Sequence, residues 1–66
     1  MQLPPAGWSQ DRLAAFRELV EAIDAYRSFR DALTEFAVNN ATLNARRDEL
    51  GNHIKNVLGP RFRDAP

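Results

Sequence analysis

The side chains that could carry out acid–base chemistry in this 66-residue chain are two pairs of carboxylates at helical spacing. Glu18 and Glu21 stand three residues apart and Asp31 and Glu35 stand four apart, so each pair would share one face of a helix. Neighbouring carboxylates support general acid–base catalysis only where their surroundings shift their pKa values apart. Arginines flank both pairs and neither lies on the apolar face, so we interpret them as a solvated outer surface.

Nucleophilic and metal-assisted chemistry find little support in the remaining side chains. The sequence has no cysteine, which excludes disulfides and thiolate metal sites, and it has a single histidine, His53. One histidine without a carboxylate cluster does not build a zinc site. The hydroxyls of Ser9 and Ser28 cannot be tied to His53 by spacing. We therefore predict that the chain is not an enzyme and that it has no catalytic, metal or cofactor site.

Basic residues gather in two places, and each raises the question of nucleic-acid binding. The end of the chain carries Lys55, Arg61 and Arg63, although cations also favour a helix C-terminus for dipole reasons alone. The segment 39–47 has the amide and basic side chains of a DNA-recognition helix. The formal net charge is zero, whereas nucleic-acid binders usually carry a basic excess. A small DNA-binding transcriptional regulator that uses 39–47 is therefore our alternative hypothesis.

The apolar residues of the second half recur every seven positions, which predicts a helical surface that lies along another helix. One heptad position holds Tyr26, Leu33, Asn40, Arg47 and Ile54, and the other holds Phe29, Phe36, Leu43, Leu50 and Val57. Every residue of the second set is large and apolar. Arg47 is unusual at such a position, because an unpaired buried arginine is too costly. We expect it to lie near the edge of the interface, or to meet a carboxylate such as Asp24 or Glu49 of a neighbouring chain.

A first helix is predicted from Gln10 to about Val38, since this range has no proline or glycine and Ser9 is a good N-cap. Its first apolar residues step by three, four and three, and they are Leu13, Phe16, Val20 and Ile23. The phase then slips before Tyr26. A slip of this kind overwinds a coiled coil locally, or it indicates two faces for two partners, and a broad core face is the simpler alternative.

The asparagine pair at Asn39 and Asn40 allows two architectures. Asparagine stops helices and caps new ones, which favours a turn between two antiparallel helices. The heptad phase nevertheless runs through the pair unbroken, and in one continuous helix Asn40 would be a buried polar residue that fixes register. The second helical segment is predicted from about Thr42 to Leu58. Gly59 followed by Pro60 predicts its stop, with a loose tail beyond.

We therefore predict an all-α fold in which an antiparallel two-helix hairpin associates into a helical bundle. The expected organisation is an irregular arm at 1–9, a hairpin domain at 10–58 and a flexible tail at 59–66. A single long helix in a parallel coiled coil is the alternative. The predicted interface consists of Leu13, Phe16, Val20, Ile23, Tyr26, Phe29, Leu33, Phe36, Leu43, Arg47, Leu50, Ile54 and Val57. A chain this short has little interior of its own, so we expect it to gain stability from a partner.

The function predicted from this architecture is protein–protein interaction. We expect an oligomerisation module that acts as an adaptor, an assembly component or an inhibitor of a larger complex, and a phage or bacterial assembly would suit its size. Its expected partners are a second copy, giving a homodimer and a four-helix bundle, and another protein. Nucleic acid and membrane are not expected, since no apolar run approaches the ~20 residues of a membrane span. The expected location is the cytoplasm or an assembled particle.

Overall fold

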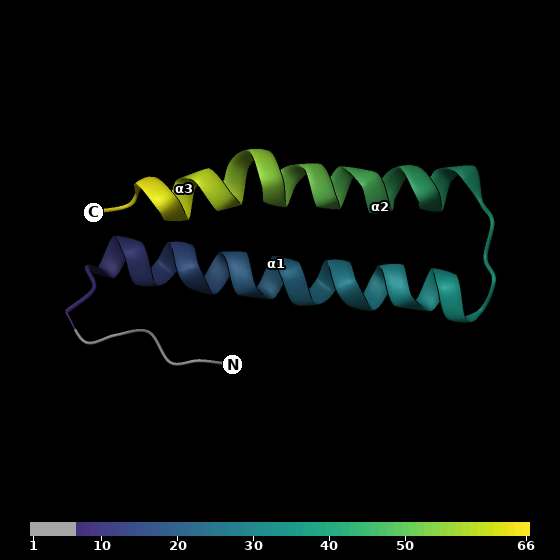
Figure 1. Cartoon of the computed structure of the whole chain (residues 1–66), viewed down its shortest axis with the longest axis horizontal. Coiled ribbons are helices and arrows are strands. Elements are labelled where there is room, and N and C mark those ends of the chain that lie inside the picture. The colour runs from purple at the N-terminus through teal and green to yellow at the C-terminus, as the bar shows by residue number, and fades with distance from the viewer. Residues whose placement is uncertain (1–6) are drawn as a thin grey trace.

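Two antiparallel helical arms joined by a short turn make up the computed structural model, which describes residues 7–66 (Figure 1). The first arm is helix α1, Gln10–Glu35. The second arm contains α2 (Ala41–His53), a π-helical turn η1 (Ile54–Leu58) and α3 (Gly59–Asp64) in direct succession. The predicted all-α hairpin is confirmed, and the alternative of one unbroken helix is wrong. The irregular structure expected for residues 1–6 lies outside the described residues.

Helix α1 begins where the sequence predicts and ends three residues early. At its start the Ser9 hydroxyl accepts a hydrogen bond from the Arg12 amide at 3.1 Å. At its end Ala37 adopts a left-handed conformation with a φ of 50°. The Ala37 amide donates to the Thr34 carbonyl at 3.2 Å and the Val38 amide donates to the Leu33 carbonyl at 2.9 Å. These two bonds form a Schellman motif, which ends the helix without a glycine.

Asn40 begins the second arm as a helix cap. Its side-chain oxygen accepts a hydrogen bond from the Leu43 amide at 3.1 Å, and the residue is exposed. The buried, register-fixing role that a continuous helix would have given Asn40 is therefore wrong. The unbroken heptad phase of the sequence therefore did not require an unbroken helix.

The stop predicted at Gly59 and Pro60 is wrong, because the second arm stays helical to Asp64. The Gly59 amide bonds to the Ile54 carbonyl, five residues back, which makes the turn before the proline a widened π turn. In a regular helix the proline ring would clash with the carbonyl four residues earlier. We attribute the tolerance to this widening, and Pro60 lies in the first turn of α3, where its missing amide costs little. The tail expected at 59–66 is thus helical over 59–64.

The hairpin is a single layer, 44 × 22 × 11 Å along its principal axes. The shortest extent equals about the 10–12 Å diameter of one helix. Each arm therefore has one neighbour, whereas most domains bury their apolar residues between at least two layers. Among the described residues only Ala15, Leu33 and Leu58 are buried apolar residues, and no side chain is completely enclosed. The core is a thin line of contact between the arms.

Candidate protein–protein interface

The middle of the hairpin is a close crossing of the two arms at Tyr26 and Gly51. A Cβ atom built on Gly51 would lie 3.1 Å from Cε1 of the Tyr26 ring, so the ring occupies the space that a side chain would need. Glycine costs helix stability at this position but lets the arms approach. The contact brings the stretch of α1 around residue 26 opposite the stretch of α2 around residue 51.

An aromatic cluster closes the end of the hairpin opposite the turn. The rings of Trp8, Phe16 and Phe62 lie with their centroids 5.5–5.6 Å apart. The Arg12 guanidinium lies 4.7 Å from the Trp8 centroid and 4.6 Å from that of Phe62, within cation–π range. Arg12 also donates hydrogen bonds to the carbonyls of Phe62 and Ala65, at 3.5 and 3.3 Å. The start of α1 is thereby joined to the end of the second arm.

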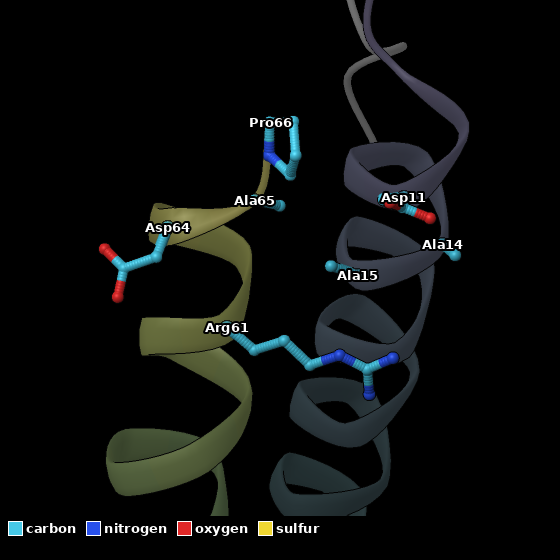
Figure 2. Close-up of a pocket in the computed structure, with 7 residues that line it drawn as sticks. All are labelled: Asp11, Ala14, Ala15, Arg61, Asp64, Ala65 and Pro66. Atoms are coloured by element: carbon cyan, nitrogen blue, oxygen red, sulfur yellow. The ribbon is translucent and has the colours of Figure 1, made fainter.

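A shallow hollow of about 410 Å³ lies between the start of α1 and α3 (Figure 2). Its lining consists of Asp11, Ala14, Ala15, Arg61, Asp64, Ala65 and Pro66. Figure 2 shows the Arg61 side chain reaching from α3 toward α1, where it pairs with Glu18, while the Asp64 carboxylate points away from α1. The Ser9 hydroxyl donates to the Pro66 carbonyl at 2.6 Å beside this hollow. The hollow brings no acid–base pair together, so we interpret it as part of the closure of the hairpin.

The structure divides the predicted interface residues among three degrees of burial. Leu33 is buried; Leu13, Phe16, Val20, Ile23, Tyr26, Phe29, Arg47, Leu50 and Ile54 are half-buried; and Phe36, Leu43 and Val57 are exposed. Phe36 is 71% exposed and Val57 is 47% exposed. We call the row Phe29, Phe36, Leu43, Leu50 and Val57 the heptad face. Three of its five large apolar side chains are exposed within the chain itself.

Sequence reasoning missed several residues that hold the arms together. Leu58, rather than Val57, is buried between the arms. Leu58 lies one heptad after Gly51, which faces Tyr26, whereas Val57 lies one heptad after Leu50. The four-residue steps from Ile54 to Leu58 and from Leu58 to Phe62 were the available signal. Ala15 was missed because alanine is a weak marker of a core position, although a close helix crossing favours a small side chain.

The charged side chains form local surface pairs. Arg47 donates a hydrogen bond to the adjacent Asp48 at 3.2 Å and Arg46 donates one to Glu49 at 3.1 Å. Whether Arg47 lies at the edge of an interface stays a prediction. Exposed pairs of this kind contribute about 0–1 kcal/mol. Arg63 donates a hydrogen bond to the Asp64 carboxylate, and this bond together with the negative charge of Asp64 raises the pKa of Arg63 above its usual value.

The four carboxylates considered for acid–base chemistry are all exposed: Glu18, Glu21, Asp31 and Glu35. Glu18 pairs with Arg61 and Asp31 pairs with Arg30. Across residues 7–66, no three histidine or carboxylate side chains gather into a group that could hold a metal ion. In the same range, no helix has both the length and the apolar character needed to cross a membrane.

Comparison with known proteins identifies no relative of this chain. No protein-family model matches the chain, and neither a curated protein nor a solved structure shows significant similarity to it. The features on which an interpretation can rest are therefore the single-layer hairpin, its thin core and the exposed apolar row.

Proposed function

We propose that this chain is a helical protein–protein interaction module, which binds by covering the heptad face with another protein surface. The observation that carries the proposal is Phe36, a large apolar side chain that is 71% exposed on the same row as the exposed Leu43 and Val57. Isolated exposed apolar residues are common, but a row of them over both arms is typical of an interaction surface. An adaptor, an assembly component or an inhibitor would use such a module, in the cytoplasm or in an assembled particle.

The energetics of a small single-layer protein favour this role. Complete burial of one large apolar side chain contributes roughly 1.5–3 kcal/mol, and the heptad face leaves much of that contribution unrealised in the isolated hairpin. Chains of this size are only marginally stable without disulfides, metals or partners. Covering the heptad face would stabilise the hairpin and the complex together.

The DNA-binding alternative receives no support from the segment 39–47. Its two arginines, Arg46 and Arg47, are each engaged by a carboxylate one or three residues away in the same helix. A phosphate contact would have to compete with these pairs, and the chain as a whole has no net positive charge to attract DNA. A steep loss of DNA affinity with added salt would be the sign of such a role.

The test introduces a charge on the heptad face and the same charge elsewhere on the same helix. Leu50→Asp should reduce the mass of any assembly in sedimentation equilibrium and should lower the helical circular dichroism signal. Ala45→Asp is the matched control, because Ala45 is exposed and lies outside the heptad face. Two results together contradict the proposal. One is a wild type that is a cooperatively folded monomer at high dilution, and the other is a Leu50→Asp variant with the same mass, helicity and bound proteins as the wild type.

A further inference from the structure

We propose that the partner of the heptad face is a second copy of this chain, whose α1 packs antiparallel on the first α1 about a two-fold axis between residues 30 and 31. This inference rests on the proposed function and names the partner of the same surface. It follows from three observations: the residues that share one side of the hairpin, the alternation of large and small side chains along α1, and the stagger of the two arms.

One side of α1 carries both large and small apolar side chains. Each residue of a helix advances by about 100°. Leu33 is buried against the second arm, and relative to it Phe29, Ala32 and Phe36 all point to the same side of the contact line. Ala25, one heptad before Ala32, points there too. Ala25, Ala32 and Phe36 are exposed and Phe29 is half-buried, which agrees with this placement.

The heptad-face residues of α2 point to that same side of the hairpin. In a view along α1 from its start, with the second arm to the right, successive residues of α1 rotate clockwise. Leu33 points right, toward the second arm, so Phe29, four residues earlier, points upward and to the right. The second arm runs back toward the viewer, so its residues advance anticlockwise. Gly51 faces Tyr26 on α1, and Leu50, about 100° before Gly51, therefore also points upward. Leu43 lies one heptad before Leu50 and shares its direction.

When two copies of α1 lie antiparallel, the large side chains of one copy face the small side chains of the other, and a parallel arrangement does not give this match. Around the point between residues 30 and 31, Phe29 lies opposite Ala32 of the second copy, and Phe36 lies opposite Ala25 of the second copy. Each large ring thus meets a small residue, which is how facing layers interdigitate in packed helices. A parallel pairing in register would instead place each phenylalanine against its own equivalent.

The same axis pairs the leucines of α2. Because the Tyr26 ring meets Gly51 across the antiparallel arms, residues 30 and 31 lie near the level of residues 46 and 47. Leu43 and Leu50 lie on either side of that level, which brings Leu43 of one copy opposite Leu50 of the other. The two-fold axis positioned from the α1 residues alone therefore also brings the leucines of the two α2 helices opposite each other. This agreement is the strongest reason to assign the face to a second copy, since a two-fold interface must be complementary to itself.

Charge and size agree with a dimer. Between residues 22 and 36, the positions along this side hold only alanine and phenylalanine, and they are 22, 25, 29, 32 and 36. The net charge of zero gives two copies no overall repulsion. Arg46 and Arg47 lie beside the face near the level of the axis, and their charges are paired with Glu49 and Asp48, respectively. A layer of 44 × 22 Å can cover the roughly 800 Å² that each partner buries in a standard interface.

Two single-cysteine variants test both the partner and its direction, because the natural chain has no cysteine. Ala25→Cys and Phe36→Cys should each stay uncross-linked alone, since the two cysteines of a pure antiparallel dimer would lie about 16 Å apart along α1. A disulfide requires Cα atoms within about 7 Å. Mixed and oxidised, the two variants should form a heterodimer of twice the 7.5 kDa chain mass, identified by mass spectrometry. Asp24→Cys with Glu35→Cys, at the same spacing on the outward side, should not cross-link.

Other results separate the failure of this inference from that of the proposed function. Cross-linking of each variant with itself would mean a parallel pairing and would overturn the inference. A wild-type dimer in which the mixed cysteines do not cross-link would mean another face, which also overturns it and leaves the proposed function standing. If the wild type is a monomer and Leu50→Asp abolishes the binding of another protein, the partner of the heptad face is that protein. This result overturns the inference and leaves the proposed function standing. Circular dichroism of each variant checks that it is folded.

Discussion

The Ala37→Gly substitution offers the most direct test of how the turn is built. Ala37 ends α1 in the left-handed region, with a φ of 50°, where a residue with a Cβ atom costs roughly 1–2 kcal/mol. Glycine removes that cost, but it also gives the unfolded chain more freedom, which takes back about 0.4–1 kcal/mol. The Schellman hydrogen bonds at 2.9 and 3.2 Å would be retained, because they involve only backbone atoms.

The expected net result is a gain of about 0.5–1 kcal/mol in the free energy of unfolding. For a protein of this size, 1 kcal/mol corresponds to a change in Tm of about 4–8 °C, so the melting temperature should rise by about 2–8 °C. Thermal denaturation followed by circular dichroism measures it. Wild type and variant must be compared at one protein concentration, since association would make Tm depend on concentration.

The matched control is the same substitution in a regular helical turn. Ala45 is exposed in the interior of α2, and Ala45→Gly should lower the free energy of unfolding by about 1 kcal/mol. Opposite signs at the two positions would establish that the left-handed conformation, rather than the residue change itself, determines the effect. A fall in Tm at both positions would refute the assignment of the turn at Ala37.

The remaining predictions concern the cap, the crossing and the aromatic cluster. Asn40→Ala should lose about 1 kcal/mol in urea denaturation because the cap to α2 disappears, whereas Asn39→Ala should lose clearly less; equal losses would contradict the cap. Gly51→Leu should lose about 1–2 kcal/mol, since a side chain there meets the facing tyrosine ring, and a stabilised variant would disprove the close crossing. Phe62→Ala should lose about 2 kcal/mol and shift Trp8 fluorescence to longer wavelength; unchanged emission would argue against the cluster.

The sequence allowed the fold class and the start of each arm to be predicted, because these depend on local chemistry. Ser9 and Asn40 both act as caps through their own side chains, and a short polar side chain before an apolar run is a signal that a single sequence carries. The hairpin was favoured over the continuous helix for the same reason. The end of α1 was placed too late, because Ala37 is a good helix former and nothing in its type predicts a left-handed conformation.

The course of the second arm beyond Ile54 depended on tertiary contacts that local reasoning does not see. Gly59 and Pro60 have the composition of a helix stop, yet Leu58 and Phe62 are packed toward α1, which favours continuation of the helix. The π turn reconciles the two requirements by inserting an extra residue into one turn. Val57 was expected at an interface with the other helix or with a partner, because the heptad count that includes Leu50 leads to it. Leu58 belongs to the row of Gly51, which has no side chain to mark that row as a core position.

The hydrogen bond between Ser9 and Pro66 makes the chain suitable for circular permutation. It places both ends of the described fold at the same pole, far from the turn (Figure 1). A short peptide could join residue 66 to Gly7, and the ring could then be opened between Val38 and Asn39 to give a circular permutant with its arms in reversed order. Both arms would keep their neighbours, so the permutant should refold into the same pair of helices with its new ends at the opposite pole.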